Sequence, residues 1–308
     1  MKLAHTPSRW WLLALGLTAT VSLQAGTPAK ECTTCSSKNP KAPVLEAVDW
    51  KVNAISPVTN PMFFEDPVIR TEIRPIFAYH RIHSSFEAGS GEAELYAVQL
   101  RYAITDRLAF IAVQDGYFNV DLDAGVELDG WMDLAAGFKY ALFEDAANQF
   151  IVTPGFTFHI PTGDDEVFQG RGSGEWNPFV SAEKGFGDLH LIGNIGVRVP
   201  NDGDEQSTVL HYSAHVDYHV CNWFIPFVEA NGWTVLSEGN NVPFRGEGYD
   251  VINFGSSNAD GVTQVLVGGG FRSRVLENVD LGVAYEKAVV SPEGLTDDRF
   301  TFDVCIRF

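Results

Sequence analysis

The sequence predicts an all-β transmembrane protein, an antiparallel up-and-down β-barrel of about twelve strands. Three observations lead to this fold class. After residue 66, apolar and polar residues alternate with a period of two, which places them on opposite faces of a strand. No apolar run after residue 25 is long enough for a spanning helix, so a chain that crosses a membrane here must do so as a closed barrel. Short turns alternate with long glycine-rich loops, as they do in membrane barrels.

The first 25 residues have the pattern of a cleaved signal peptide. Lys2 and Arg9 precede an apolar run over residues 10–21, which is too short to span a bilayer. Ala25 offers a small residue at which cleavage is expected. We therefore expect residues 1–25 to be a signal peptide and the mature chain to be exported.

Residues 26–65 lack a sustained hydrophobic period and are rich in Pro, Lys, Ser and Asn. Such a composition is typical of irregular structure. The sequence thus predicts an irregular periplasmic N-terminal extension over residues 26–65 and a barrel domain over residues 66–308.

The last ten residues show the strand pattern most clearly. From Arg299 to Phe308 every even position is apolar and every odd position is polar or small. Residues 208–220 repeat the pattern, with Tyr and Val on one wall and His and Asp on the other. Further strands are expected near residues 69–80, 96–104, 132–142, 150–160, 189–199, 264–272 and 280–286, whereas 108–117 and 223–234 are ambiguous in phase.

The connections between these strands fall into two classes. Turns of a few residues, such as 105–107 and 221–222, alternate with longer polar stretches, such as 161–175 and 235–261. Counting strands through this alternation places both termini on the short-turn side. A soluble all-β protein would explain the asymmetry only by coincidence. Aromatic residues at the strand ends suit the interfacial girdles of a membrane barrel. These residues are Tyr79, Tyr102, Tyr117, Trp131, Tyr140, Trp176, Tyr218, Trp223, Trp233 and Tyr285.

The polar wall of the expected strands carries charges of both signs. In a membrane barrel this wall faces the interior, whereas the apolar wall faces lipid. We therefore expect a lumen of mixed charge. Its candidate lining residues are Arg70, Glu72, Arg74, Arg101, Lys139, His159, Arg198, His211, His215, Asp217, Arg272, Glu286, Asp303 and Arg307.

The formal net charge of the chain is -19. This balance argues against nucleic acid as a partner, because phosphates need a basic surface. Acidic loops would suit lipopolysaccharide bridged by divalent cations, although charge that keeps exposed loops solvated explains them more simply. We expect outer-membrane lipid and lipopolysaccharide as the surroundings and no cofactor.

The carboxy-terminal segment resembles the closing strand of bacterial outer-membrane proteins. Those strands alternate apolar residues and end in Phe, as residues 299–308 do here. The resemblance implies that Phe308 is the signal read by the barrel-insertion machinery, and that the protein resides in the bacterial outer membrane.

Two short segments carry a second resemblance. One is the turn Ile104-Thr105-Asp106-Arg107-Leu108; the other is Ser56-Pro57-Val58-Thr59-Asn60-Pro61, followed by Glu65-Asp66-Pro67. Over residues 56–308 the chain resembles the barrel proteins named after the phenol meta-cleavage pathway, the MetA-type transporter family. The resemblance implies a transporter or channel for small solutes of hydrophobic or aromatic character, and it carries over no substrate-binding residue.

Cys32 and Cys35 form a CxxC pair. Because the periplasm is oxidising, a local disulfide is expected. No second CxxC or His pair lies nearby, which leaves zinc and redox roles without support. A link from this pair to Cys221 or Cys305, which would fix the tail inside the lumen, stays open.

His211, His215, Asp217 and His219 share one face of one expected strand. Neighbouring members lie about 7 Å apart along a strand, too far for all four to bind one ion. We expect no metal site but a hydrated lumen wall that changes charge at about pH 6 to 7; a contribution of two residues to a metal site stays open.

These features together predict a channel or transporter for small solutes, and no enzyme. Pairing of opposite charges across a narrow lumen would instead leave a structural or adhesive barrel without conductance. A lipid-hydrolysing barrel would need a Ser–His pair, and Ser84 beside His83, or Ser256, lies in a loop without the context of an activated nucleophile.

Overall fold

The computed structural model describes residues 50–291 and 294–308. These described residues all belong to one compact unit. The expected signal peptide and residues 26–49 of the expected extension, with Cys32 and Cys35, lie outside the described residues. Among the described residues, no helix has the length and apolar character needed to cross a membrane.

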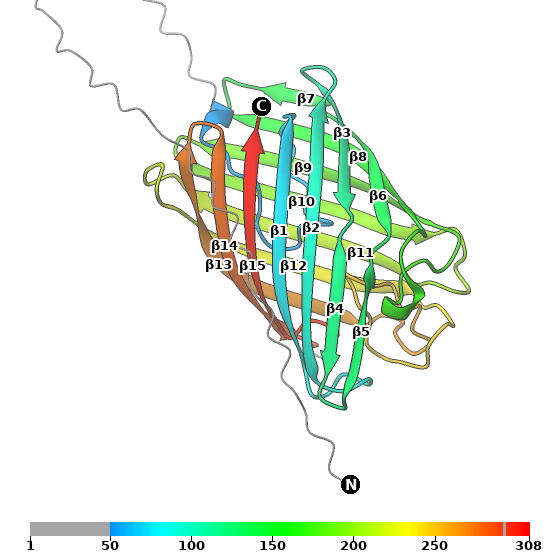
Figure 1. Ribbon diagram of the computed structural model, residues 1–308. Coiled ribbons are helices and arrows are strands. Elements are labelled where there is room, and N and C mark those ends of the chain that lie inside the picture. The colour runs from blue at the N-terminus through cyan, green and yellow to red at the C-terminus, as the bar shows by residue number, and fades with distance from the viewer. Residues whose placement is uncertain (1–49, 292–293) are drawn as a thin grey trace, which may run out of the picture. The chain divides into compact units, whose positions relative to one another are not determined.

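The described chain forms one closed antiparallel barrel whose wall contains twelve strands (Figure 1). β1 pairs with both β2 and β15, and this pairing closes the ring. Two strands of the wall are each interrupted, so that β3 with β4 and β5 with β6 count as one strand each. The wall consists of β1 (Glu72–Ile82), β2 (Gly91–Ala103), β3 (Leu108–Gln114) with β4 (Tyr117–Leu122), β5 (Val126–Trp131) with β6 (Leu134–Tyr140), β8 (Phe150–Ile160), β9 (Glu175–Phe186), β10 (Leu189–Pro200), β11 (Thr208–Tyr218), β12 (Ile225–Ser237), β13 (Thr263–Leu276), β14 (Val279–Val290) and β15 (Asp298–Arg307). The short strand β7 (Phe143–Asp145) pairs with the start of β8. The predicted fold class and the predicted number of strands are confirmed.

The two faces of the wall are inverted relative to a soluble protein. On β11, His211 and Asp217 are buried, whereas Val216 is 43% exposed. On β15, Asp303 is buried and Phe300 is 44% exposed. Polar side chains therefore face the interior while apolar side chains cover the outside, which is the arrangement that a lipid environment requires.

The two segments of ambiguous phase have separate explanations. The expected strand at 108–117 is split at Asp115 and Gly116 into β3 and β4. Gly116 has a φ of 121°, a conformation that favours glycine, and a Cβ there would collide with the Tyr96 carbonyl oxygen. On β12, apolar residues lie on both faces: Phe227 and Val235 are buried inside, whereas Val228 and Leu236 are exposed outside. The expectation of Trp233 in an outer girdle is wrong, because its side chain is 1% exposed and packs inside the barrel.

The wall is interrupted beside β5. Among the described strands β5 pairs only with β4, while β6 continues the wall to β8. The free edge of β5 contacts the loop over residues 161–174, which contains the 3-10 helix η2 (Asp165–Val167). Trp131 N donates to Asp164 Oδ2 at 2.7 Å, and Asp164 N donates to the Trp131 carbonyl at 2.8 Å. Two hydrogen bonds with one loop residue thus take the place of a strand ladder here.

The carboxy-terminal end of the expected extension is buried in the structure. After the 3-10 helix η1 (Trp50–Val52), every residue from Ala54 to Val68 is buried. This segment, called the plug below, bonds to side chains of strands around the whole ring, including β2, β8, β9, β12 and β13. Contacts with strands on all sides place the plug inside the barrel. Its backbone has no ladder of its own, so its polar groups are satisfied by the charged inner wall.

Candidate functional site

Twelve of the fourteen candidate lumen residues are buried on the inner side of the wall. Arg70 and Arg307 are partly exposed at the short-turn end, where Arg70 contacts Asp66 at 3.1 Å and Arg307 contacts Asp280 at 2.6 Å. The buried twelve are Glu72, Arg74, Arg101, Lys139, His159, Arg198, His211, His215, Asp217, Arg272, Glu286 and Asp303. Many of them contact the plug or one another rather than an open passage.

A first anchor binds the beginning of the plug. Arg74 Nη2 donates to the Pro57 carbonyl at 2.6 Å, and Arg272 Nε donates to the Ser56 carbonyl at 2.7 Å. Asp303 lies between the two guanidinium groups and accepts from Arg272 Nη1 at 2.7 Å and from Arg74 Nε at 2.6 Å. This carboxylate offsets the charge of the pair and fixes the direction of both arginines.

A second anchor binds the end of the plug. Glu65 accepts from Arg101 Nη2 at 2.7 Å and from Lys139 Nζ at 2.6 Å. All three side chains are buried. Removing one partner of such an ion pair leaves an uncompensated buried charge, so the two cations from β2 and β6 hold Glu65 firmly.

A third anchor lies on β11 and β12. Glu229 accepts the backbone N–H of Val58 at 2.9 Å and also bonds Thr59. His215 Nδ1 lies 2.7 Å from Glu229 Oε1, and its Nε2 lies 3.1 Å from Asp217 Oδ2. A neutral imidazole has one N–H, so donation to both carboxylates requires the imidazolium form.

The other two histidines of the expected β11 group do not join this anchor. His211 Nε2 bonds Asn177 Oδ1 at 2.7 Å, and His219 Nε2 bonds Asn222 Oδ1 at 3.2 Å at the short-turn end. In the described part of the chain, no three His, Cys, Asp or Glu side chains are grouped so that they could bind a metal ion.

The long loop over residues 238–262 covers the interior at the opposite end from the short turns. Its Asp250 pairs with Arg299 of β15, and the Tyr249 carbonyl accepts from Arg198 of β10. Glu247 organises the loop by accepting from Ser207 Oγ at 2.7 Å and from the Ser256 amide at 2.8 Å. Burial raises the pKa of the Glu247 carboxyl above its ordinary value, although these hydrogen bonds oppose the rise.

An apolar pocket, called the mouth pocket below, lies beneath the same loops. It has a volume of about 40 Å³, and its lining consists entirely of apolar side chains. They come from the loop after β1, from β4 and β5, from η2 with Phe168, from the loop over 238–262, and from Leu295 between β14 and β15. The lining residues are Phe86, Ala88, Val120, Leu122, Leu128, Val167, Phe168, Phe244, Ile252, Phe254 and Leu295.

Sequence reasoning missed this pocket because it treated the long loops as polar. The signal that could have revealed it is the presence of large aromatic residues in those loops, such as Phe86, Phe244 and Phe254, whose rings contact one another in the structure. Solvated loops have no reason to carry such side chains.

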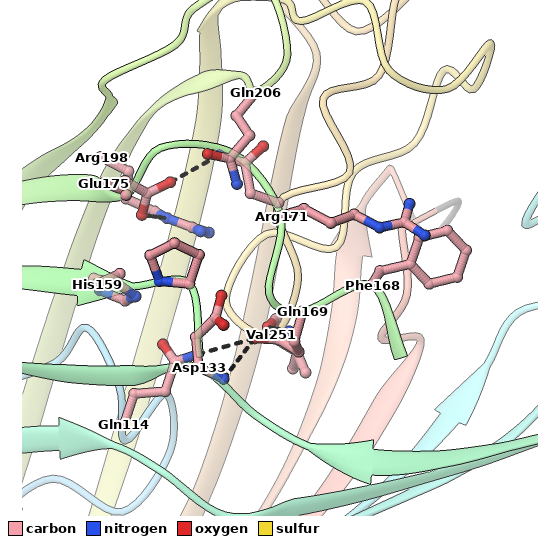
Figure 2. Close-up of a pocket in the computed structure, with 13 residues that line it drawn as sticks. Gln114, Asp133, His159, Phe168, Gln169, Arg171, Glu175, Arg198, Gln206 and Val251 are labelled. Atoms are coloured by element: carbon pink, nitrogen blue, oxygen red, sulfur yellow. Dashed lines mark hydrogen bonds and ion pairs between the residues drawn. The ribbon is translucent and has the colours of Figure 1, made fainter. Parts of the chain in front are cut away.

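A second, polar pocket of about 20 Å³ adjoins the mouth pocket (Figure 2). Phe168 lines both pockets. The floor of the polar pocket touches the plug: the His159 ring stacks on Phe63 with centroids 5.5 Å apart, and the Arg198 guanidinium lies 4.7 Å from the centroid of the same ring. Arg198 Nε also donates to Glu175 at 2.6 Å. The pocket therefore joins the covering loops to the plug.

The serines considered for lipid hydrolysis are not arranged for it. Ser256 is buried, and its hydroxyl donates to the Gly246 carbonyl at 2.7 Å. His83 Nδ1 contacts Ser85 rather than Ser84. Cys221 is exposed and Cys305 is buried, and both are free thiols.

Comparison with known proteins supports the fold. No protein-family model matches the sequence, and no curated protein matches it. The COG4313 outer membrane channel from Pseudomonas putida F1 is similar in structure, with a TM-score of 0.53 and 15% identity over 78% of this chain and 96% of that one. The NanC porin has a TM-score of 0.48 and 10% identity over 77% of this chain and 98% of that one. The similarity to the COG4313 channel shows that the chain has the fold of a bacterial outer-membrane channel.

Proposed function

We propose that this chain is an outer-membrane transporter for small apolar solutes, which enter at the mouth pocket and pass when the plug moves. The observation that carries the proposal is the continuity of apolar packing from the mouth pocket into the barrel. Phe86, Val120 and Phe254 belong to one packed cluster with Met62 and Phe63 of the plug. An apolar solute would bury its surface along this path, with a gain of about 25 cal/mol per Å².

The interior does not suit a permanently open aqueous pore. The plug fills the barrel between its charged walls, and residues of the 238–262 loop bond to β10 and β15 from the other side. A hydrophilic solute would have to displace both segments. An apolar solute can bind favourably in the mouth pocket before the plug has to move. A hydrophilic solute has no such favourable first step, so the arrangement favours apolar solutes.

The free edge of β5 lies beside the mouth pocket. Leu128 of β5 and Val167 of η2 line the pocket on either side of the interruption in the wall. Two hydrogen bonds between Trp131 and Asp164 join these elements, far fewer than a strand ladder would provide. Apolar solutes dissolved in the membrane would therefore meet a weakly joined part of the wall next to an apolar pocket.

The resemblance to the MetA-type family supports the same class of solute, namely small hydrophobic or aromatic compounds. Aromatic side chains at the mouth pocket, such as Phe168 and Phe244, suit an aromatic ring as well as an alkyl chain. Barrel insertion through Phe308 and a surrounding of lipopolysaccharide remain part of this proposal.

Photolabelling would test the proposal directly. The full-length protein in lipid nanodiscs would be irradiated with a pentadecane that carries a diazirine, and the adducts would be mapped by mass spectrometry. We expect adducts on Phe244, Phe254 or Leu128.

Two variants of Leu128 provide the matched test. L128D would abolish these adducts and L128M would retain them, because only L128D places a charge in the pocket. Cells that produce L128D should also take up radiolabelled decane more slowly than cells that produce L128M. Equal labelling and uptake in both variants would contradict the proposal.

The filled lumen also favours a second candidate, a structural or adhesive barrel. Planar-bilayer recording together with the uptake assay separates the two. Well-folded protein that neither conducts ions nor increases decane uptake would support the structural role.

A further inference from the structure

The polar pocket is next to the mouth pocket, so one molecule can extend from the mouth pocket into the polar pocket. Phe168 lines both pockets, and the neighbouring residues Val251 and Ile252 line the polar and the apolar pocket respectively. A ligand with an apolar body in the mouth pocket can therefore place a head group among polar side chains a short distance away.

Four donor side chains of the polar pocket, those of Arg171, Arg198, Asn253 and Gln169, are engaged within the protein, and Arg171 pairs with Asp165. Arg198 donates to Glu175 and to the Tyr249 carbonyl. Asn253 Nδ2 donates to Glu175 Oε2 at 2.8 Å and to the Ser207 carbonyl at 2.9 Å. Gln169 Nε2 donates to the Val251 carbonyl at 3.1 Å. A head group that needs donors would find these four side chains occupied.

Acceptors, in contrast, are left over. Asp133 uses one oxygen, Oδ1, to accept the amides of Thr162, Gly163 and Gly170 at 2.8 to 2.9 Å, which leaves Oδ2 for another donor. Figure 2 shows the Asp133 carboxylate between His159 and Gln169, directed into the pocket.

Two buried atoms of the lining also have no partner within the described residues. They are Gln206 Oε1 and Nε2 of His159, a side chain that is 6% exposed. Buried polar atoms without partners are rare, and such an atom commonly marks the place of a missing water or ligand. His159 is held flat on Phe63 of the plug, so its ring is fixed in position toward the pocket.

We propose that the two pockets together bind an amphiphile, with its apolar body in the mouth pocket and a hydrogen-bond-donating head, a hydroxyl or an ammonium group, at Asp133, His159 and Gln206. This inference rests on the proposed function and adds the chemistry of the head group. Alkanols and alkylamines satisfy it, whereas a carboxylate head would face the Asp133 oxygen with another acceptor.

Competition with the photolabel tests the proposal. Wild-type protein in nanodiscs would be labelled with the diazirine pentadecane in the presence of decan-1-ol, decan-1-amine, decanoate or decane. We expect the alcohol, the amine or both to suppress labelling of the mouth pocket at concentrations about tenfold lower than decanoate or decane, as one hydrogen bond to a charged acceptor implies.

The variant D133N sharpens the test. Asn keeps an oxygen for the three loop amides and replaces the free carboxylate oxygen by an amide donor. We expect the preference for donor heads to fall about tenfold and the competition by decanoate to improve. Q206M removes a second acceptor without touching the loop amides and should reduce the same preference. Heat-modifiable mobility on gels would show that both variants form closed barrels.

The outcomes separate this proposal from the proposed function. If decane competes as well as decanol, and D133N and Q206M change nothing, the head-group site is contradicted while apolar binding stands. If the photolabel does not enter the mouth pocket of the wild type at all, the proposed function itself fails.

Discussion

His215 illustrates how a single side chain can hold a segment that is distant in the sequence. Its ring nitrogens face Glu229 at 2.7 Å and Asp217 at 3.1 Å, and Glu229 binds the backbone of Val58. The sequence pattern places His215 on the polar wall of its strand. The pattern does not reveal that His215 lies between two carboxylates and must be an imidazolium to donate to both. One of these carboxylates, Glu229, belongs to another strand.

Replacement of His215 should therefore weaken the protein. We expect H215Q to lower the free energy of unfolding by about 3–5 kcal/mol, the cost of removing one partner of a buried ion pair. Urea unfolding in phospholipid vesicles would measure it. H211Q is the matched control, because His211 is also buried on β11 but bonds only the neutral Asn177; its cost should be about 1 kcal/mol. Equal losses in the two variants would refute the role of His215 charge.

At the scale of elements, the plug is an irregular segment ordered by others. The carbonyl groups that a strand would use in a ladder are bound by side chains of the wall. Arg74 donates to the Pro57 carbonyl, Gln99 Nε2 to the Pro61 carbonyl at 2.8 Å, and Thr153 Oγ1 to the Pro67 carbonyl at 2.7 Å. The prolines prevent a regular element, and the wall supplies the hydrogen bonds in its place.

Weakening the plug should open an ion path. We expect the double variant E65Q/E229Q to increase the open probability of single barrels in planar bilayers about tenfold or more, because each substitution removes the charge that holds one part of the plug and tenfold corresponds to only about 1.4 kcal/mol. E92Q, at an exposed position of β2, is the control and should behave as the wild type. Unchanged currents in the double variant would mean that the plug is held by other contacts.

The loop over residues 238–262 should respond to pH through Glu247. Its pKa is raised by burial, so the folded loop binds this proton more tightly than the unfolded loop does. The stabilisation of the loop by protonated Glu247 is therefore fully present below the ordinary pKa of a glutamate. It is lost as the pH rises through the pKa that Glu247 has in the folded loop. We expect faster amide hydrogen exchange in the loop, after correction for the intrinsic rate, as pH rises through this window.

The variant E247Q provides the comparison, since it cannot titrate. Its loop should exchange at a corrected rate that does not change across the same pH window. If wild type and E247Q share the same pH profile, another group controls the loop.

At the scale of the whole molecule, stability depends on a barrel that is apolar outside and charged inside. Ile195 on β10 is 53% exposed on the outer face, whereas its neighbour Asn194 is buried and bonds Ser181 Oγ at 2.8 Å. In water the outer face would be an unusually large apolar surface. In a bilayer the same face is solvated by lipid, and pairing between neighbouring strands satisfies the polar backbone groups of the wall outside the free edge of β5.

A charge on the outer face should therefore be costly. We expect I195R to destabilise the barrel by about 2–4 kcal/mol in phospholipid vesicles, as for a cation near the middle of a bilayer. I195L should be close to neutral, because it preserves the apolar contact with lipid. A negligible effect of I195R would contradict the exposure of this face to lipid.

The sequence by itself determined the architecture of the wall. Strands such as 299–308 carry a period of two over their whole length, and this period is a local property that survives without any knowledge of neighbours. It identified which side chains, for example Arg272 and Asp303, point inward. It failed where the inner face is apolar, as at Trp233, because the contrast between the two faces then disappears.

Only the tertiary structure decided how the lumen is filled. Residues 54–68 have no hydrophobic period, and their partners lie far along the chain: Glu65 meets Arg101 and Lys139, and Ser56 meets Arg272. The same holds for the two pockets, whose lining comes from strands and loops brought together by closure of the ring. Local periodicity determines which face of a strand is wet, but contacts between distant segments exist only once the barrel has closed around them.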